Sequence, residues 1–504
     1  MTYMMTLQQA LDWVPDATLW GDGSIKVARV HTDTRTVQLG DLFVALRGDH
    51  YDANEFLAEA KAKGAAAVIT DSKEQLEKAQ VPGLVVQDTR KALGLIARGW
   101  RAQFKLPLIT VTGSNGKTTV TQMIASILRV YRPQTMLATE GNFNNDVGVP
   151  LTLLRLNASH QVAVVELGMN HPGEIAWLAD ISQPTVALVN NAQREHLEFM
   201  SSVEAVAREN GSVIASLPSA GVAVFPHDDE FSPLWHSIAV YRPKLTFAVI
   251  PPHPRGERQR VDGRSADIVC ERPDWAQSAW QVRVDTPTGE LSFSLRSPGL
   301  HNVKNALAAV ACTMAVGVPL AEIAKGLESF QPVKGRSRAL RGVSHGSEFE
   351  LVDDTYNANP DSVRAAIEIL AGLPGPRLLV LGDMGEVGLN GPQFHAEAGA
   401  YARTVGIEAL FTLGELSKVA SEAFETFGTF ESLGKGVHWQ SMDALKKGVL
   451  DALPEYRSVL VKGSRFMKME RVVEAVMAAA HDSSVAEGLV ASTSARVSVE
   501  APCS

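Results

Sequence analysis

A glycine-rich segment beginning at residue 113 carries the residue types that bind phosphate. It reads GSNGKTT, follows the apolar run PLITVT, and leads into the helix-like run TTVTQMIASIL. Gly113 and Gly116 allow several backbone N–H groups to point inward, and the helix after Lys117 adds the positive end of its dipole. The Lys117 amine suits β and γ phosphates, and the Thr118 hydroxyl suits Mg²⁺. The predicted phosphate loop is Gly113, Ser114, Asn115, Gly116, Lys117, Thr118 and Thr119.

The spacing within this loop is shorter than in the usual P-loop, which has four residues between its glycines. Here only Ser114 and Asn115 separate them. The alternative interpretation is a strand–turn–helix junction with an incidental lysine. Strand, glycines, GKT and helix follow one another in the order that phosphate binding requires, which favours the first interpretation.

Two candidate metal ligands follow the next predicted strands. Glu166 lies near the end of VAVVELG (162–168), and His196 follows TVALVNNA (185–192), which we take as the strand next to that of Glu166. Parallel sheets bind ligands at the carboxyl edge of their strands. A buried carboxylate there needs a compensating charge. We therefore predict that Glu166 meets the Mg²⁺ held by Thr118, with His196 as a further ligand; the alternatives are a solvent-facing carboxylate and a structural histidine.

Two groups of asparagines could bind a polar substrate. Asn142 and Asn145 lie in GNFNNDVGVPLT, where their amides can donate to phosphate or substrate oxygens, although an ordinary Asn/Gly turn has the same composition. Asn302 and Asn305 are three residues apart in HNVKNALAA, so on a helix they share one face. That face can read the polar edge of a base; helix capping by Asn302 is the alternative.

The elements that must position these residues form an α/β chain of three predicted domains. At roughly 150 residues per domain, 504 residues favour three. We place a small α/β domain at 1–106, a central parallel sheet with helices on both faces at 107–334, and a doubly wound, Rossmann-like domain at 335–480. Residues 481–504 lack periodicity and are predicted to be a disordered tail.

Individual strands of these domains can be located. The first domain has DLFVAL (41–46) and AAAVIT (65–70), and the third has candidates at 349–354, 377–383, 409–414 and 458–464. The stretch 226–290 is rich in Pro, Arg and Asp, so we interpret it as a loop or insertion on the central domain.

Composition excludes several classes of protein. The chain is 45% hydrophobic and 20% charged with a net charge of −9, which is typical of a soluble globular protein and disfavours coating of nucleic acid or anionic lipid. Cys270, Cys312 and Cys503 show no pairing or metal-binding spacing, which indicates free thiols in a reducing compartment. The start has no signal-peptide pattern, and no apolar stretch is long enough to span a membrane. We expect a cytoplasmic monomer.

Six motifs together carry a family resemblance. GSNGKTT, VVELG, NNAQREH, GLHNVKN, KGR and DDTYNANPDS occur in this order, and the chain resembles the ATP-dependent Mur ligase family over about residues 25–480. The segments DDTYNANPDS, LGDMGEVG and VLVKGSR are similar to those of the member that uses D-alanyl-D-alanine. The resemblance implies an amide ligase whose substrates are ATP, UDP-N-acetylmuramoyl-tripeptide and D-Ala-D-Ala, with a first domain that holds the UDP group and a second that binds ATP.

The resemblance also implies roles for single residues. Thr118 and Glu166 would bind one Mg²⁺, and Glu166 with His196 a second. Around ATP, Asn302 and Asn305 would lie beside adenine, Arg336 would reach the γ-phosphate, and Asp354 would contact the ribose. The implied substrate contacts are Thr34 and Arg35 in the uridine-binding loop, Asn142 and Asn145, and, for the dipeptide, Asn357, Asn359 and Ser362.

One position departs from the family pattern. Many members carry a Lys-Gly-Glu triplet about fourteen residues after the histidine, and its carbamylated lysine completes the second metal site. Here the stretch reads ARENGSVI, and Asn210 occupies the lysine position. An amide cannot be carbamylated, so we predict an enzyme without a carbamate, in which the second Mg²⁺ binds more weakly or Glu209 supplies the charge.

Two other functions remain open at this point. One is a folylpolyglutamate-type or other Mur ligase with a different acceptor. The other is a P-loop ATPase in which hydrolysis drives a conformational switch and needs no carboxylate or amine substrate.

Overall fold

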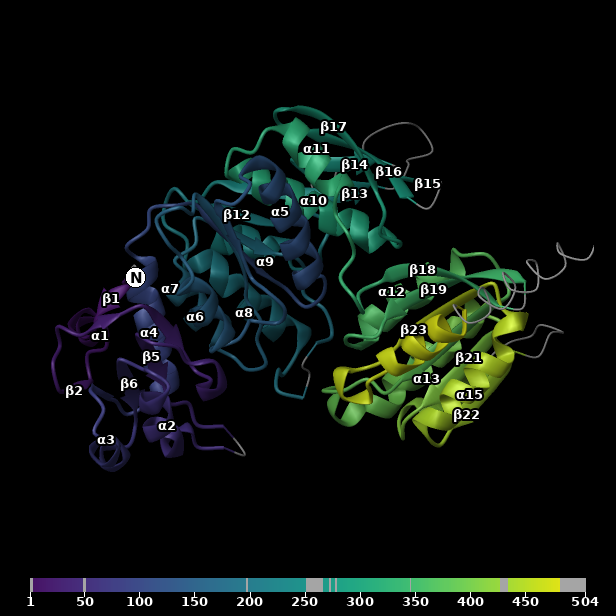
Figure 1. Ribbon diagram of the computed structural model, residues 1–504. Coiled ribbons are helices and arrows are strands. Elements are labelled where there is room, and N and C mark those ends of the chain that lie inside the picture. Colours follow the sequence, from purple (N-terminus) through teal and green to yellow (C-terminus); the bar gives the residue numbers. More distant parts are fainter. Residues whose placement is uncertain are drawn as a thin grey trace, which may run out of the picture.

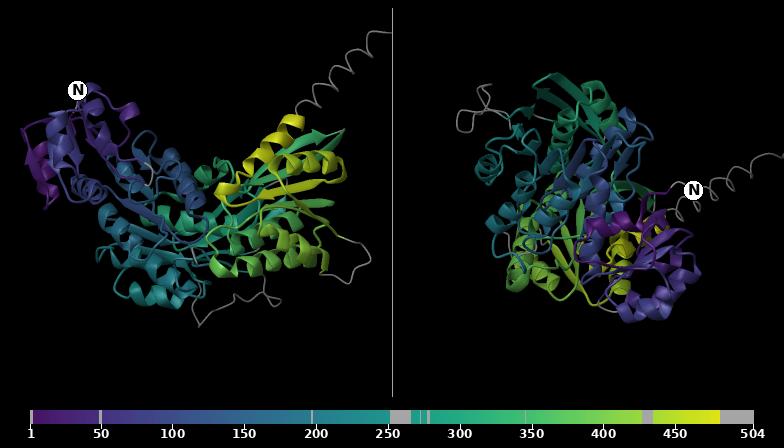
Figure 2. Two further views of the ribbon diagram at one scale, coloured as in Figure 1. Left: turned by 90° about the horizontal axis from the view of Figure 1, so that it is seen from below. Right: turned by 90° about the vertical axis from the view of Figure 1, so that its left-hand side faces the viewer.

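Three large sheets and their helices form three parts of the molecule, and a small two-stranded sheet belongs to the first of them (Figure 1 and Figure 2). The computed structural model describes residues 3–48, 51–195, 198–250, 266–271, 273–276, 279–344, 346–426 and 434–480. The part with the central sheet lies between the other two in Figure 1 and in the left view of Figure 2. His196 and the tail predicted at 481–504 lie outside the described residues, so neither prediction is tested.

The first sheet has the strand order β2-β7-β6-β5-β4 and is parallel except for β2. The predicted strands at 41–46 and 65–70 are confirmed by β5 and β6. The strand bounds are Thr18–Trp20 (β2), Arg29–His31 (β4), Asp41–Val44 (β5), Ala67–Thr70 (β6) and Gly83–Val85 (β7), with Met5–Thr6 (β1) paired to Lys26–Val27 (β3). The helices are Leu7–Trp13 (α1), Leu57–Ala62 (α2), Lys73–Ala79 (α3) and Thr89–Arg101 (α4).

The central sheet has ten strands in the order β15-β16-β14-β13-β12-β11-β8-β10-β9, with β17 paired to β16. The seven strands from β14 to β9 are parallel, and the others pair antiparallel. Their bounds are Leu108–Thr112 (β8), Met136–Ala138 (β9), Val162–Glu166 (β10), Val186–Val189 (β11), Val222–Pro226 (β12), Lys244–Ile250 (β13), Ile268–Glu271 (β14), Asp274–Ala276 (β15), Ala279–Thr286 (β16) and Gly289–Leu295 (β17).

Both faces of this sheet are covered, as predicted, because alternate residues of each buried strand enter different cores. Ala163 and Val165 of β10 pack into one core, whereas Val162 and Val164 pack into the other. The first core is closed by α4, Gly148–Leu153 (α6), Glu174–Ser182 (α7), Val203–Ala215 (α8) and Ser232–Ile238 (α9). The second is closed by Lys117–Tyr131 (α5), Leu300–Ala315 (α10) and Leu320–Glu328 (α11).

Two sequence-based predictions about this part are wrong. The stretch 226–290 is not a loop, because α9, β13, β14, β15 and β16 lie in it; its most Pro- and Arg-rich residues, 251–265, are outside the described ones. Strands in which polar and apolar residues alternate, such as β16, give a weak signal beside so much Pro and Arg. In addition, β10 and β11 are not neighbours, because β8 lies between them. Glu166 and the segment after β11 therefore flank the phosphate loop.

The third sheet has the order β18-β19-β23-β20-β21-β22 and is parallel except for the β18–β19 hairpin. Its four predicted strands are confirmed. The strand bounds are Arg338–Ser344 (β18), Ser347–Asp354 (β19), Arg377–Gly382 (β20), Ala409–Leu413 (β21), Lys435–Trp439 (β22) and Ser458–Lys462 (β23). The helices are Pro360–Ala371 (α12), Gly391–Thr404 (α13), Ser417–Thr426 (α14) and Met442–Ala452 (α15), and two cores fill its faces.

In the described part of the chain, no helix combines the length and the apolar content needed to cross a bilayer.

Candidate active site

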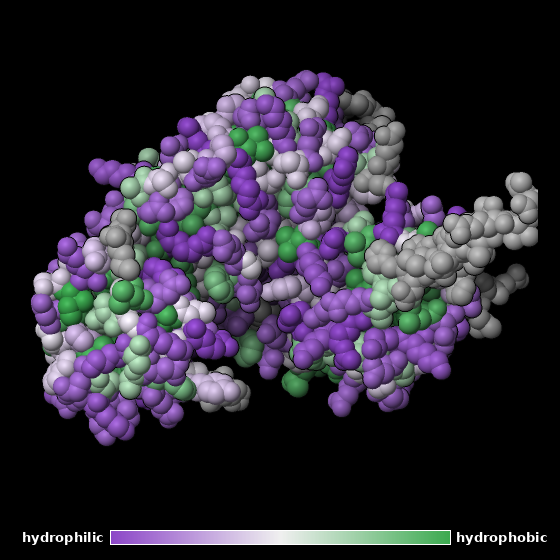
Figure 3. All heavy atoms as spheres, in the orientation of Figure 1, coloured by the Kyte–Doolittle hydropathy of each residue, from purple (hydrophilic) through white to green (hydrophobic). Residues whose placement is uncertain are grey.

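A cleft of about 640 Å³ lies between the central and C-terminal parts and extends along the carboxyl edge of the central sheet. Figure 3 shows the molecule hollowed between these two parts. The cleft is lined by most of the predicted residues: Ser114, Asn115, Gly116, Lys117, Thr118, Thr119, Asn142, Asn145, Glu166, Asn302, Asn305, Arg336, Asp354, Asn357, Asn359 and Ser362. The fold thus brings together residues that are far apart in the sequence, although their roles stay predictions.

The phosphate loop connects the end of β8 to the start of α5. Gly113 and Gly116 have φ angles of 130° and 83°, which side-chain-bearing residues rarely adopt. A Cβ atom on Gly116 would lie 2.5 Å from Asn305 Oδ1, so glycine is needed for space as well as for conformation. The following 15-residue helix directs the positive end of its dipole at the cleft, which favours a bound anion.

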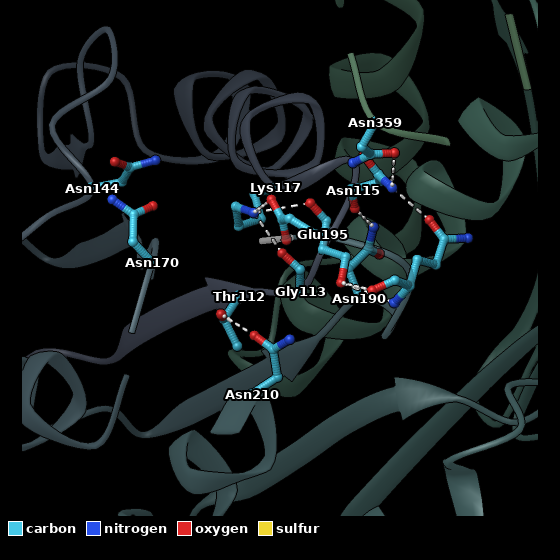
Figure 4. A network of polar contacts seen from close by, with 12 residues as sticks. Thr112, Gly113, Asn115, Lys117, Asn144, Asn170, Asn190, Glu195, Asn210 and Asn359 are labelled. Carbon is cyan, nitrogen blue, oxygen red and sulfur yellow. Dashed lines mark hydrogen bonds and ion pairs between the residues drawn. The ribbon is translucent and has the colours of Figure 1, made fainter. Parts of the chain in front are cut away.

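Lys117 is held within the loop by three acceptors. Its Nζ donates to the carbonyl oxygens of Gly113 (2.6 Å) and Ser114 (3.0 Å), and it forms an ion pair with Glu195 Oε1 at 3.0 Å (Figure 4). Both side chains are largely buried, with 14% of Lys117 and 9% of Glu195 exposed. The lysine is therefore positioned at the loop by a carboxylate that the sequence analysis did not select.

Thr118 and Glu166 lie together beside the loop. The Thr118 hydroxyl donates to Glu166 Oε1 at 3.0 Å, and Asn144 Nδ2 donates to the same oxygen at 2.8 Å. Glu166 is only 1% exposed, and its Oε2 atom has no hydrogen-bond partner among the described residues. A buried carboxylate oxygen without a partner is costly. A Mg²⁺ ion fits here, because its ligands are oxygens and it takes part of its coordination from water and phosphate.

A second metal site has no complete set of protein ligands among the described residues. Within the described ranges, no cluster of three or more His, Cys, Asp or Glu side chains could hold a metal ion by itself. Asn210 is fully buried on α8 and accepts a hydrogen bond from the Thr112 hydroxyl at 2.7 Å. Glu209 accepts one from the backbone N–H of Ile175, in the first turn of α7 (2.9 Å). Both side chains thus have structural contacts, and neither lines the cleft.

Amides link the phosphate loop to β11 and to α10. Asn190 Nδ2 donates to the Asn115 carbonyl (2.8 Å) and to Asn305 Oδ1 (2.9 Å), while Asn191 Oδ1 accepts from the Asn115 N–H (2.8 Å). Asn302 does not cap α10, because its Nδ2 donates to the Pro298 carbonyl instead and Gly299 is the N-cap residue. The face shared by Asn302 and Asn305 therefore lies against the loop, at the place where a nucleotide base could enter.

The C-terminal part contributes a buried ion pair. Lys462 Nζ lies 2.5 Å from Asp354 Oδ2 and donates to the Asn357 carbonyl at 2.9 Å. Asp354 Oδ1 accepts from the Ser337 N–H at 2.9 Å, which anchors the connection between the two parts. Next to it, the Arg336 guanidinium lies 4.1 Å from the centroid of the Tyr356 ring, in a cation–π contact. These contacts place Arg336 and Asp354 on the wall that faces the phosphate loop.

Helix α12 touches the phosphate loop with its N-terminus. Asn359 is its N-cap and forms a capping box with Ser362, and Asn359 Nδ2 also donates to Asn115 Oδ1 at 2.9 Å (Figure 4). The side chains of Asn359 and Ser362, predicted to bind a dipeptide, therefore already have structural contacts. Asn357 contributes its carbonyl to Lys462, and its side chain remains the stronger candidate of the three.

Arg194 provides a second link between the two parts. Its guanidinium forms a forked contact with Asp361 on α12 (2.7 and 3.1 Å) and reaches Glu397 on α13 at 3.2 Å. Its backbone N–H also donates to Asp361 Oδ2 at 2.8 Å. The hydrogen bonds to Asp361 raise the pKa of Arg194. Charge-assisted forked contacts are strong and directional, so this pair fixes how α12 meets the cleft.

Two titratable groups at the edge of the cleft have shifted pKa values. Burial raises the pKa of Asp229, against the opposing influence of the Phe231 N–H and Lys304. Burial lowers the pKa of His301, which lies near Asp354 and Lys462. In both cases removal from water disfavours the charged form.

Of the four substrate residues predicted in the first two parts, two line the cleft and two do not. Thr34 and Arg35 are in a short 3-10 helix of the first part and do not line the cleft; Arg35 pairs with Asp33 at 2.7 Å. Asn142 and Asn145 line the cleft, and Asn145 Oδ1 accepts from the Gly148 N–H at 2.8 Å. These positions suit a long substrate that reaches from the first part into the cleft.

Several residues of the site were missed by sequence reasoning. NNAQREH was considered for His196 alone, although its Arg194 and Glu195 make the contacts described above. Lys462 was part of a recognised motif but received no role, because its partner Asp354 is more than a hundred residues away. Charged residues directly after a buried strand were the available signal.

Comparison with known proteins defines the class. The Mur ligase family, catalytic domain model matches residues 26–101, the Mur ligase middle domain model 111–313, and the Mur ligase, glutamate ligase domain model 335–465. The chain belongs to the Mur ligase family.

Within this family, the chain is similar to UDP-N-acetylmuramoyl-tripeptide–D-alanyl-D-alanine ligases. It is 37% identical to that of Escherichia coli (strain K12) over 474 residues, which cover 94% of this chain and 98% of the relative. Identity to that of Bacillus subtilis (strain 168) is 32% over 459 residues, 88% and 92% of the two chains. A crystal structure of MurF from Acinetobacter baumannii has a TM-score of 0.82 at 32% identity, covering 94% of this chain and 98% of that one.

Proposed function

We propose that this chain is an ATP-dependent ligase that joins D-alanyl-D-alanine to UDP-N-acetylmuramoyl-tripeptide, giving UDP-N-acetylmuramoyl-pentapeptide, ADP and phosphate. Relatives with this activity in their names match nearly the whole chain. The observation that carries the proposal is the cleft, in which a phosphate loop and the buried Glu166 face Arg336 and Asp354 from the C-terminal part. A ligase needs a triphosphate and a carboxylate held face to face between such walls.

The chemistry follows from the poor reactivity of carboxylates. A carboxylate does not condense with an amine at neutral pH, because its leaving group is too poor. In the proposed reaction, an oxygen of the tripeptide carboxylate attacks the γ-phosphorus of ATP, and ADP leaves. The dipeptide amine then attacks the acyl phosphate, and the tetrahedral intermediate loses phosphate to give the amide.

The side chains of the cleft have roles suited to these steps. Lys117 and Arg336 offset the negative charge that builds up on the transferred phosphoryl group. Thr118 and Glu166 would hold Mg²⁺, which neutralises phosphate charge when it is bound. Asn302 and Asn305 lie beside the adenine, and Asp354 contacts the ribose. Docking of the C-terminal part excludes water from the acyl phosphate, which would otherwise hydrolyse.

The remaining assignments complete the proposal. The domains are 1–106, 107–334 and 335–480, and the first holds the UDP group near Thr34 and Arg35. Asn142 and Asn145 contact the muramoyl peptide, and Asn357 contacts the dipeptide. His196 is the further ligand for a second Mg²⁺, and Asn210 makes a carbamate impossible at its position. The enzyme acts as a monomer in the cytoplasm.

A phosphate-release assay with defined omissions tests this function. Phosphate should form with ATP, UDP-tripeptide and D-Ala-D-Ala together, and its release should fall to background when either the UDP-tripeptide or the dipeptide is left out. D-Ala should replace the dipeptide poorly. Phosphate release with ATP alone would indicate a P-loop ATPase instead, and turnover with a folate and glutamate would indicate a ligase with another acceptor.

A further inference from the structure

The ion pair between Lys117 and Glu195 has a consequence for nucleotide binding. A lysine ammonium has three N–H donors, and here they meet three acceptors: the Gly113 and Ser114 carbonyls and Glu195 Oε1 (Figure 4). All three contacts are 3.0 Å or shorter. A phosphate oxygen can therefore bind Lys117 only by displacing one of them.

The three acceptors differ in how readily they can leave. Gly113 and Ser114 belong to the phosphate loop itself, and their carbonyls are fixed by the same backbone that binds the anion. Glu195 comes from the segment after β11 and reaches the lysine through a side chain with rotatable bonds. Its carboxylate is also the acceptor that an incoming phosphate would repel, since both are anions in a site shielded from water.

The segment that carries Glu195 is firmly placed on either side of the carboxylate. Asn190 and Asn191 bind the backbone of Asn115, and Arg194 donates through its backbone and side chain to Asp361 of the C-terminal part. The carboxylate is thus presented to Lys117 by a scaffold of hydrogen bonds within the protein. Its position reflects the fold rather than an accidental surface contact.

We propose that Glu195 is a positioning residue that occupies Lys117 in the nucleotide-free enzyme and is displaced when a phosphate of ATP binds. The carboxylate holds the lysine extended and paired, so that the loop is preformed before ATP arrives. In return, Glu195 weakens the binding of nucleotide phosphates and helps ADP to leave after turnover. This inference rests on the proposed ATP site.

The test is the affinity for ADP without divalent metal, measured by isothermal titration calorimetry in EDTA. Glu195→Gln keeps the size of the side chain and removes its charge, so it should bind ADP about tenfold more tightly, the difference between a charged and a neutral hydrogen bond. Glu195→Asp keeps the charge and should bind within about threefold of the unmodified enzyme. Glu198→Gln, the matched control, removes an exposed charge three residues further on and should leave the affinity unchanged.

The outcomes separate the possible roles of Glu195. A residue that only shapes the loop would weaken ADP binding when it is changed to glutamine, so equal or weaker binding by Glu195→Gln overturns the inference. If Glu198→Gln also bound ADP more tightly, the gain in affinity would come from net charge alone, and the inference would again be overturned. If the unmodified enzyme itself binds no ADP, the proposed ATP site fails, which is a distinct result.

Discussion

The two junctions between the three parts of the molecule are built from different interactions. At the first junction, one hydrophobic core runs from the first sheet into the central sheet, joining residues such as Leu42 and Ile69 to Leu108 and Val165. At the second, the described residues form no shared apolar core; every cluster there stays on one side. The contacts that cross it include amide hydrogen bonds and ion pairs, as between Asn115 and Asn359 or Arg194 and Asp361.

Helix α4 shows how the first junction is fixed. Its Arg101 is buried and donates to the carbonyls of Ser182 and Gln183 on the central part, at 3.1 Å each, and burial lowers the pKa of its guanidinium. Trp100 donates to the Leu156 carbonyl at 3.0 Å. Because burial of this shared apolar core stabilises the contact strongly, we expect the first and central parts to move as one body. Polar contacts can exchange with water, so the second junction can open and close over substrates.

The largest effect is expected from Arg101→Ala at the first junction. The change leaves several buried carbonyl groups without a donor, and the free energy of unfolding should fall by roughly 3–4 kcal/mol. Urea denaturation followed by tryptophan fluorescence measures it. Arg98→Ala, on the same helix, removes an exposed pair with Asp180 and should cost less than about 1 kcal/mol. Similar losses for both variants would mean that the junction does not depend on the buried guanidinium.

Substitutions at the second junction are expected to have a smaller effect. They should lower turnover rather than stability. Arg194→Ala and Asp361→Ala should each lower kcat about tenfold, because α12 no longer docks against the phosphate loop. The free energy of unfolding should change by less than about 1 kcal/mol, since the pair is partly exposed.

A double-mutant cycle sharpens this prediction. The double variant should be no slower than either single variant, because the two residues act through one contact. Arg208→Ala is the matched control, since its pair with Glu204 lies within α8. Independent, multiplying losses of turnover would show that Arg194 and Asp361 do not work as a pair.

The smallest effect separates two roles of Asn359. Asn359→Ala removes the N-cap of α12 and its contact with Asn115, and should destabilise the protein by about 1 kcal/mol. Asn359→Ser keeps a capping side chain that is too short to reach Asn115, so stability should be nearly unchanged. Both variants should lower turnover to a similar extent, as measured by phosphate release. Full activity of the serine variant would assign Asn359 to helix capping alone.

The sequence predicted the elements of the site better than its contacts. Local sequence patterns identified the phosphate loop, the strand ends and α10. The strands predicted from these patterns correspond to β8, β10, β11 and β19. The hairpin strands β15, β16 and β17 lie on an edge, where polar and apolar residues mix, and the first two fell within the predicted loop. The order of strands, with β8 between β10 and β11, depends on crossover connections that no local pattern contains.

The difference between local and long-range information also explains which site residues could be predicted from the sequence. Glycines and the GKT triplet act through the backbone they occupy, so Gly113 and Lys117 could be identified from the sequence alone. Glu195 and Lys462 act through partners 78 and 108 residues away, and the sequence gives no sign of which partner each will meet. Long-range ion pairs become visible only once the chain has folded.

The most direct test of the central claim is an isotope-transfer measurement. UDP-tripeptide carrying ¹⁸O in its terminal carboxylate would be converted with ATP and D-Ala-D-Ala, and the released phosphate analysed by mass spectrometry. Activation of that carboxylate by ATP across the cleft predicts one ¹⁸O atom in each phosphate, since the oxygen that attacked phosphorus leaves with it. Pentapeptide formation with unlabelled phosphate would contradict the account.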